Sequence, residues 1–301
     1  MKVSVLMGGT SAERAISLKT GKAVINACLE LGYETTPVDF SGDFDSILKD
    51  LKSSDIVFNA LHGTIGEDGT IQSWLDENNI HYTGSDSRSS RLCMNKSESK
   101  KIVKKNNYFT PSWSIIDNNS TKIMDEVVKK IDFPCIIKPN AQGSTFGLSI
   151  ANNNNELIEA ISLASNYDSR SLIEQYIVGR EITVGILGGK ALPIVEIIPD
   201  HQLYDYECKY IPGMSQYLCP ADIDFNKELQ IKEDSEKIFK LLGCSGYGRL
   251  DFLLDESGRH FFLELNTLPG MTSTSLFPIA ASNSGKSFTE LVKIIIRMSI
   301  N

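Results

Sequence analysis

The stretch RLDFLLDESGRHFFLELN, residues 249–266, is the most informative part of the chain for its fold. Two apolar runs flank Asp255–Gly258, which has the composition of a four-residue turn with glycine at its end. Such a pattern predicts a β-hairpin, in which Leu254 lies opposite Arg259. The C-terminal part of the chain is therefore expected to contain an antiparallel sheet.

The polar residues of this hairpin are spaced so that they share one face of the sheet. Side chains of a strand alternate between faces, so Arg249 and Asp251 lie on one face, as do Glu264 and Asn266. The predicted turn pairs Arg249 with Glu264 and makes Asp251 a diagonal neighbour of Glu264. Two carboxylates and an amide oxygen so placed can hold one or two Mg²⁺ ions. The alternative is an ion pair between Arg249 and Glu264 on a solvent-exposed surface. The prediction depends on the strand register, because a shift of one residue would move the side chains of one strand to the other face.

A second informative segment is the small-residue loop NAQGSTFG, residues 140–147. It follows an apolar strand predicted over Phe133–Lys138, so a lysine stands at the mouth of the loop. Backbone N–H groups of such a loop can surround a phosphate, and hydroxyls add donors. An ordinary turn is the alternative. The acidic hairpin in the same chain favours the phosphate interpretation.

The N-terminal part alternates strands and helices, which predicts a parallel, Rossmann-like sheet. Its functional loops should follow the strands, at Gly8–Glu13 and at His62–Gly69, although the second could be a plain loop. We expect three domains, at 1–95, 96–180 and 181–301. The polar aromatic segment Tyr204–Tyr210 is expected to be a surface loop or a lid over a site.

Composition restricts the class of protein. The chain has 301 residues, 41% of them hydrophobic, and a formal net charge of -8, which argues against a nucleic-acid partner. No apolar run reaches the ~20 residues that span a bilayer, so no membrane partner is expected. The N-terminal apolar run is too short for a signal peptide. Six scattered cysteines without a C-x-x-C motif indicate a reduced, cytoplasmic protein without structural zinc.

Taken together, these motifs resemble the D-alanine–D-alanine ligases of the ATP-grasp superfamily, from about residue 3 to about residue 292. Six separated blocks in the same order carry the resemblance. They are GGTSAER at 8–14, HG and GEDG at 62–69, KP and GS at 138–144, YDY and KY at 204–210, Arg249 with Asp251, and ELNT, PGMT and SL at 264–276.

The resemblance implies an α/β ATP-grasp fold and a reaction. ATP would phosphorylate the carboxylate of one D-alanine, and the amine of a second would attack the acyl phosphate. The product would be D-alanyl-D-alanine for peptidoglycan synthesis. The implied cofactors are ATP and two Mg²⁺ ions, with Mn²⁺ as the alternative metal. The resemblance also suggests a homodimer.

Site residues follow from the same resemblance. The residues implied in nucleotide binding are Lys96, Lys138, Gly143, Thr145, Glu174, Tyr176, Ile177, Glu181 and Lys209. Those implied in catalysis are Glu13, Ser144, Tyr210, Arg249 and Gly270. Those implied in binding the second substrate are His62, Ser275 and Leu276. The implied metal ligands are Asp251, Glu264 and Asn266.

Within this scheme, Glu13 would bind the ammonium of the first D-alanine and would form a hydrogen-bonded set with Ser144 and Tyr210. Arg249 and the backbone N–H of Gly270 would stabilise the tetrahedral oxyanion.

The chain departs from the family pattern in the phosphate loop. It has Thr145 and Phe146 where a second serine and a smaller apolar residue are usual, so the packing of the lid is open to question. Tyr210 favours an amine acceptor, because relatives that accept D-lactate often lack this tyrosine. The alternatives are another carboxylate–amine or carboxylate–hydroxyl ligase of the superfamily, such as a D-alanine–D-lactate ligase, and an inactive nucleotide-binding scaffold.

Overall fold

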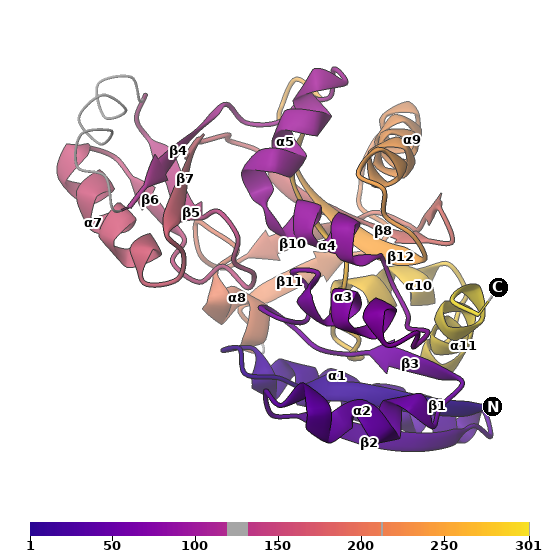
Figure 1. Cartoon of the computed structure of the whole chain (residues 1–301). Coiled ribbons are helices and arrows are strands. Elements are labelled where there is room, and N and C mark those ends of the chain that lie inside the picture. Colours follow the sequence, from indigo (N-terminus) through magenta and orange to yellow (C-terminus); the bar gives the residue numbers. More distant parts are fainter. Residues whose placement is uncertain (119–131, 212, 301) are drawn as a thin grey trace.

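The computed structural model describes residues 1–118, 132–211 and 213–300. It shows the expected mixed α/β fold, with three β-sheets and their helices arranged along the chain (Figure 1). The sheets span residues 2–59, 113–175 and 180–266, while the domain boundaries themselves stay predictions. None of the helices in the described ranges is both long and apolar enough to cross a membrane.

The N-terminal sheet is parallel, as predicted, and has the strand order β2-β1-β3. Its strands are β1 (Lys2–Gly8), β2 (Glu34–Phe40) and β3 (Ile56–Asn59), and its helices are α1 (Arg14–Glu30), α2 (Phe44–Lys52), α3 (Thr70–Glu77) and α4 (Ser87–Met94). Because β1 and β3 are neighbours, the loops after them meet. The Ser11 hydroxyl donates a hydrogen bond of 2.7 Å to the carbonyl of His62, which joins the two predicted functional loops.

The central sheet is antiparallel, with the order β4-β7-β5-β6. Its elements are β4 (Trp113–Asp117), β5 (Cys135–Pro139), β6 (Ser149–Ala151), α7 (Asn154–Ser165) and β7 (Arg170–Gln175). Helix α7 begins after Asn153, whose side chain accepts hydrogen bonds from the N–H groups of Asn155 and Glu156. The segment between β5 and β6 is the predicted phosphate loop.

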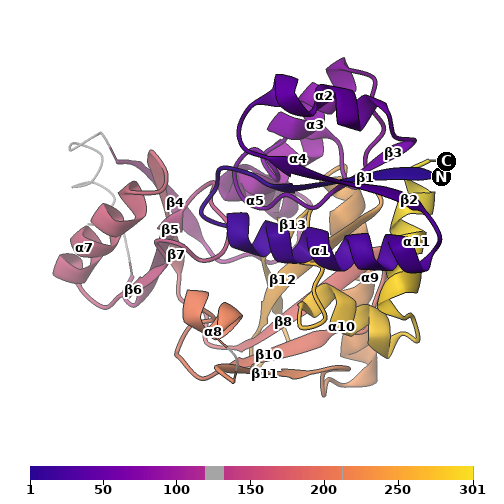
Figure 2. The same cartoon turned by 90° about the horizontal axis from the view of Figure 1, so that it is seen from below.

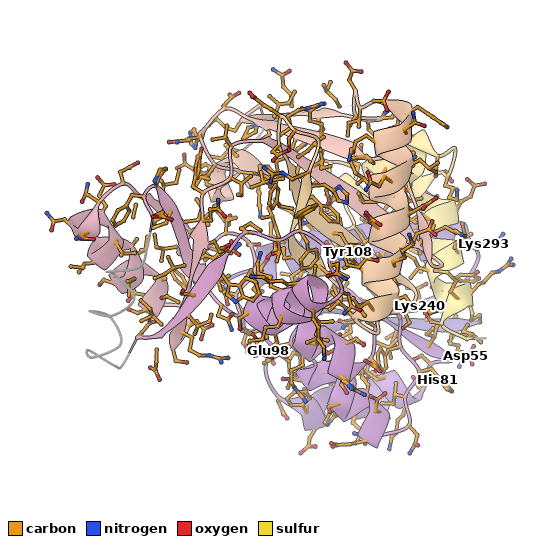
Figure 3. The ribbon with its side chains drawn as sticks, turned by 90° about the horizontal axis from the view of Figure 1, so that it is seen from above. Asp55, His81, Glu98, Tyr108, Lys240 and Lys293 are labelled. Atoms are coloured by element: carbon orange, nitrogen blue, oxygen red, sulfur yellow. The ribbon has the colours of Figure 1, made fainter. Side chains whose placement is uncertain are left out.

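The C-terminal sheet has the order β11-β10-β8-β12-β13, with β9 paired to β8. Its strands are β8 (Arg180–Leu187), β9 (Lys190–Ala191), β10 (Val195–Pro199), β11 (Ser215–Leu218), β12 (Tyr247–Leu254) and β13 (His260–Asn266). Helices α5 (Lys96–Lys105) and α9 (Phe225–Leu241) pack on one face of this sheet. Tyr108, which follows α5, lies close to α9 (Figure 3).

The last two helices connect the C-terminal sheet to the N-terminal domain. Helix α10 (Leu276–Asn283) packs against β8, and α11 (Phe288–Met298) packs against the end of α1 (Figure 2). The apolar side of α11 is buried through Leu291, Val292 and Ile295, within one core that also contains Val24 of α1. Burial of each such side chain contributes about 1.5–3 kcal/mol. This shared core fixes the N-terminal loops relative to the C-terminal sheet.

Candidate active site

Two adjoining cavities meet at the polar face of the β12–β13 hairpin. The larger has a volume of about 380 Å³ and lies between the central and C-terminal sheets. The smaller, of about 220 Å³, lies between the C-terminal sheet and the N-terminal loops. The residues that line both are Lys96, Gly143, Tyr204, Lys209 and Glu264. We call them the large and the small cavity.

The predicted site residues divide between these cavities. Those lining the large cavity are Lys96, Lys138, Gly143, Thr145, Glu174, Tyr176, Ile177, Glu181, Lys209, Asp251 and Glu264. Those lining the small cavity are Glu13, His62, Lys96, Gly143, Ser144, Lys209, Arg249, Glu264, Asn266, Gly270, Ser275 and Leu276. Tyr210 ends α8 (Tyr206–Tyr210), but its side chain lies outside the described residues. Side chains far apart in the sequence therefore converge on one place.

The register predicted for the hairpin is wrong at the turn. Leu254 pairs with His260 and not with Arg259, because Asp255 is itself paired: its N–H donates to the Arg259 carbonyl at 3.0 Å. The connecting loop is thus three residues long and ends at Gly258, whose φ of +79° favours glycine. This change alone would turn Glu264 to the opposite face of the sheet.

A β-bulge between Asp251 and Phe252 restores the polar face. Beyond the bulge, Asp251 is directly opposite Glu264 rather than diagonal to it, and Arg249 is opposite Asn266 rather than Glu264. A bulge places an extra residue on one strand, so it changes the register by one more position. The four polar side chains therefore share a face, as predicted, although their partners differ from the prediction.

Arg249 and Asp251 form a two-point ion pair along β12. The Nε and Nη2 atoms of Arg249 donate to Oδ1 and Oδ2 of Asp251 at 2.9 and 2.8 Å. The hydroxyl of Thr183, on the neighbouring strand β8, also donates to Oδ1, at 2.6 Å. Burial disfavours the charged form of Arg249, but Asp251 more than compensates and raises the pKa of the guanidinium. Arg249 is thereby held as a cation at the small cavity.

Glu264 lies among lysines. The Nζ atom of Lys96 is 3.0 Å from its Oε2 and also donates to the Gln142 carbonyl at 2.7 Å. Burial would raise the pKa of Glu264, but Lys96, Lys138 and Lys209 together lower it below the usual value. The carboxylate therefore stays ionised at the junction of the two cavities.

Glu174 is the most enclosed of the predicted nucleotide residues. Its side chain is 3% exposed, and Lys100 and Lys138 each approach one of its carboxylate oxygens to 2.7 Å. Both carboxylate oxygens of Glu174 thus have cationic neighbours. The next residues, Tyr176 and Ile177, line the large cavity.

The loop after β5 bends sharply at Ser144 and Thr145, whose φ angles of 51° and 57° are left-handed. The Ser144 hydroxyl donates a hydrogen bond to Oε1 of Glu13, so the loop is joined to the N-terminal domain. The Thr145 hydroxyl donates to the Ser144 carbonyl at 2.6 Å. Phe146 contacts Tyr206 of α8, with ring centroids 5.1 Å apart.

Glu13 has an unsatisfied oxygen at the small cavity. The residue is 5% exposed, and no group among residues 1–118, 132–211 and 213–300 hydrogen-bonds to its Oε2. Burial and the charge of Glu67 raise the pKa of Glu13, against the opposing effects of Ser144, His62 and Lys209. A buried carboxylate oxygen without a donor is costly, so this position suits a ligand that carries N–H groups.

His62 is held in a fixed orientation beside Glu13. Its Nδ1 lies 3.2 Å from Oε1 of Glu67, and its Nε2 lies 3.0 Å from the Thr20 hydroxyl. Both ring nitrogens therefore have partners in the protein. The His62 side chain is buried and lines the small cavity.

Gly270 and Ser275 also line the small cavity. A Cβ atom on Gly270 would lie 2.9 Å from the Ser275 hydroxyl, so a larger residue here would displace the Ser275 side chain. That hydroxyl accepts a hydrogen bond of 3.1 Å from the N–H of Thr272, which fixes the turn before α10. Leu276 is the first residue of α10, and its side chain is buried.

The segment Tyr204–Tyr210 is not simply a loop, because its last five residues form α8. Asp205 caps the helix by accepting a hydrogen bond of 2.9 Å from the N–H of Cys208. The Nζ atom of Lys209 lies 5.1 Å from the Tyr204 ring centroid, a cation–π contact at the junction of the cavities.

Sequence reasoning gave no role to Lys100, Glu67 or Thr183, which all contact predicted site residues. Lys100 could have been found, because it follows Lys96 by four residues and so shares its face of α5. Thr183 could not, because only the pairing of β8 with β12 brings it to Asp251.

Comparison with known proteins identifies the family. The family model described as "D-ala D-ala ligase C-terminus" matches residues 103–297, and the model described as "D-ala D-ala ligase N-terminus" matches residues 42–85. The D-alanine–D-alanine ligase of Aquifex aeolicus is 46% identical over 98% of this chain and 100% of its own length. The chain belongs to the D-alanine–D-alanine ligase family.

Solved structures of D-alanine–D-alanine ligases share the fold. The ligase of Bacillus anthracis complexed with ATP is 33% identical, with a TM-score of 0.88 over 100% of this chain and 97% of its own. A D-Ala:D-Ser ligase from Enterococcus faecalis is 29% identical, with a TM-score of 0.85 over 99% of both chains.

Proposed function

We propose that this protein joins two D-alanine molecules to D-alanyl-D-alanine, with conversion of ATP to ADP and phosphate, in the synthesis of peptidoglycan precursors. Family membership and the ATP complex of the Bacillus anthracis relative support this proposal. The observation that carries it is the hydrogen bond from Ser144 to Glu13. This hydrogen bond places the Glu13 carboxylate, which could bind the ammonium group of a substrate, beside the loop that could bind a triphosphate.

Nucleotide binding is assigned to the large cavity. The base and ribose would lie along Tyr176, Ile177 and Glu181, beside apolar side chains of the C-terminal sheet. Lys138, Lys96 and Lys209 would face the phosphates, because all three line the same cavity. Phosphoryl transfer depends mainly on positioning and on neutralised charge, which such a set of cations supplies.

The first D-alanine would lie in the small cavity with its ammonium at Glu13. The Oε2 atom of that carboxylate, which has no hydrogen-bond partner among the described residues, is an acceptor that fits the role. The substrate carboxylate would then point toward Gly143 and Ser144, and one of its oxygens would attack the γ-phosphorus of ATP. The products of this step are D-alanyl phosphate and ADP.

The second D-alanine would be positioned by Ser275, Leu276 and His62, and its amine would attack the carbonyl carbon of D-alanyl phosphate. Arg249 and the N–H of Gly270 would stabilise the negative oxygen of the tetrahedral intermediate, since both line this cavity. Collapse of that intermediate would form the peptide bond and expel phosphate. Exclusion of water would protect the acyl phosphate from hydrolysis.

Asp251, Glu264 and Asn266 are proposed to hold two Mg²⁺ ions, with Mn²⁺ as the alternative. The donor set fits, because it consists of hard oxygen atoms on one sheet face and Glu264 stays ionised. The ions would neutralise phosphate charge during transfer. A homodimer and a cytoplasmic location complete the proposal, and light scattering would test the first.

A second candidate is transfer to an acceptor other than D-alanine. The similarity to a D-Ala:D-Ser ligase favours including D-serine with D-lactate as rival acceptors. The test is to incubate the protein with ATP, Mg²⁺, D-alanine and each acceptor in turn, and to measure phosphate and identify products. D-Alanyl-D-alanine should predominate; faster formation of a D-serine or D-lactate product would overturn the assignment.

A further inference from the structure

Lys100 is a buried cation that the steps above do not use. Its side chain in α5 is 0% exposed, although burial of an unpaired ammonium is strongly unfavourable. Its Nζ atom has three oxygen neighbours: Glu174 Oε1 at 2.7 Å, the Thr110 hydroxyl at 2.9 Å and the Phe262 carbonyl at 3.1 Å. The contacts with Thr110 and Phe262 are hydrogen bonds, and the contact with Glu174 is an ion pair.

The contacts of Lys100 connect helix α5 to strands β7 and β13. Glu174 belongs to β7 on one side of the large cavity, and Phe262 belongs to β13, two residues before Glu264. Lys138 lies at the other oxygen of Glu174, also at 2.7 Å, and its side chain is 13% exposed in the cavity. Glu174 thus lies between one fully enclosed lysine and one that reaches the cavity.

The charges of this cluster decide what the cavity presents to a ligand. A Lys138–Glu174 pair alone would be neutral, whereas the cluster of Lys100, Glu174 and Lys138 has a net charge of +1. Inside a protein such a charge acts over several ångströms with little screening. Because Lys100 offsets the negative charge of Glu174, the positive charge of Lys138 is not cancelled by its ion pair.

We infer that Lys100 is a positioning residue for the nucleotide: through Glu174 it fixes the Lys138 ammonium in the large cavity and keeps the cluster positive toward the triphosphate. This inference rests on the proposed function of the cavity. It differs from a purely structural role, because a structural lysine would affect stability without a selective effect on nucleotide binding.

The direct test is calorimetric titration of ADP and ATP into Lys100→Met, with thermal unfolding as the check on folding. Removal of the charge should raise the nucleotide Kd at least tenfold, as expected for loss of about 1.4 kcal/mol, and leave the KM for D-alanine within about twofold. Equal losses for both substrates, or an unchanged nucleotide Kd in a folded variant, would overturn the inference.

Two variants serve as matched controls. Lys101→Met removes the adjacent lysine, which is 60% exposed and pairs with Glu98 of α5. Thr110→Val removes a neighbour of Lys100 but keeps the charge. Both should bind nucleotide within about threefold of the unsubstituted protein, because neither changes the charge of the cluster. A loss in Thr110→Val equal to that in Lys100→Met would contradict the charge argument.

A measurement on the unsubstituted protein covers the case in which Lys100→Met does not fold. Burial lowers the pKa of Lys100 to about 8, against the opposing effect of Glu174, whereas the pKa of Lys138 is raised by Glu174 and Glu264. Binding of ADP should therefore weaken as pH rises through about 8. A constant Kd from pH 7 to about 9.5 would overturn the inference. Absence of any nucleotide binding would instead refute the proposed function.

Discussion

Asp251 and Glu264 face each other directly across the β12–β13 hairpin, and they do so because a bulge beside Asp251 offsets the register set by the turn. Without the bulge, the two carboxylates would lie on opposite faces of the sheet. The proposed metal site therefore depends on one extra residue in β13. Bulges occur often beside active sites, where they redirect a side chain.

Glu264→Gln should raise the Mg²⁺ concentration needed for activity. The amide keeps the shape of the side chain but loses the charge that Lys96, Lys138 and Lys209 now stabilise. We expect the half-saturating Mg²⁺ concentration to rise about 10–100-fold, measured by phosphate release in a Mg²⁺ titration. Glu256→Gln, in the exposed turn of the same hairpin, should change it little. An unchanged requirement in Glu264→Gln would exclude this carboxylate as a ligand.

Arg249→Lys should reduce turnover about 10²–10³-fold. Lysine keeps the charge but cannot donate to both oxygens of Asp251, so the cation would be displaced from the oxyanion position. The measurement is kcat at saturating D-alanine. Arg259→Lys is the matched control: Arg259 is exposed, pairs with Asp255 on the same hairpin, and should retain kcat when substituted. Comparable losses in both variants would argue against the oxyanion role.

Local patterns in the sequence predicted much of this architecture. The parallel N-terminal sheet followed from alternation of strands and helices, and the shared face of Arg249 and Asp251 followed from strand periodicity. The register was not predictable, because it depends on pairing of Asp255 with Arg259 and on a bulge that has no marker such as glycine. The Ser144–Glu13 bond came only from resemblance, since 131 residues separate its partners.

Phe146→Leu should increase the hydrolysis of ATP that is not coupled to dipeptide formation. Phe146 contacts both Tyr206 of α8 and Tyr167, at centroid distances of 5.1 and 5.7 Å, and so holds α8 against the phosphate loop. Such contacts contribute about 0.5–1.5 kcal/mol, so ATP hydrolysed per dipeptide formed should rise about two- to tenfold. Phe109→Leu, which alters the pair with Phe261, is the control. An unchanged ratio would show that this contact does not protect the acyl phosphate.

The pH profile of kcat/KM for D-alanine should have an acidic limb set by Glu13. Burial and Glu67 raise the pKa of Glu13, so its carboxylate becomes protonated, and loses the ammonium, at a higher pH than an ordinary glutamate. Glu67→Gln removes a charge that raises this pKa, so the limb should move to lower pH. Glu77→Gln, an exposed substitution in α3, should leave it in place. Movement to higher pH in Glu67→Gln would contradict the assignment.

The central claim is that the carboxylate of D-alanine becomes phosphorylated before the peptide bond forms. The most direct test is reaction of ATP with D-alanine that carries ¹⁸O in its carboxylate, followed by mass spectrometry of phosphate and dipeptide. We expect ADP as product, and one ¹⁸O atom in the inorganic phosphate for each dipeptide formed. Unlabelled phosphate, or release of AMP and pyrophosphate, would contradict it.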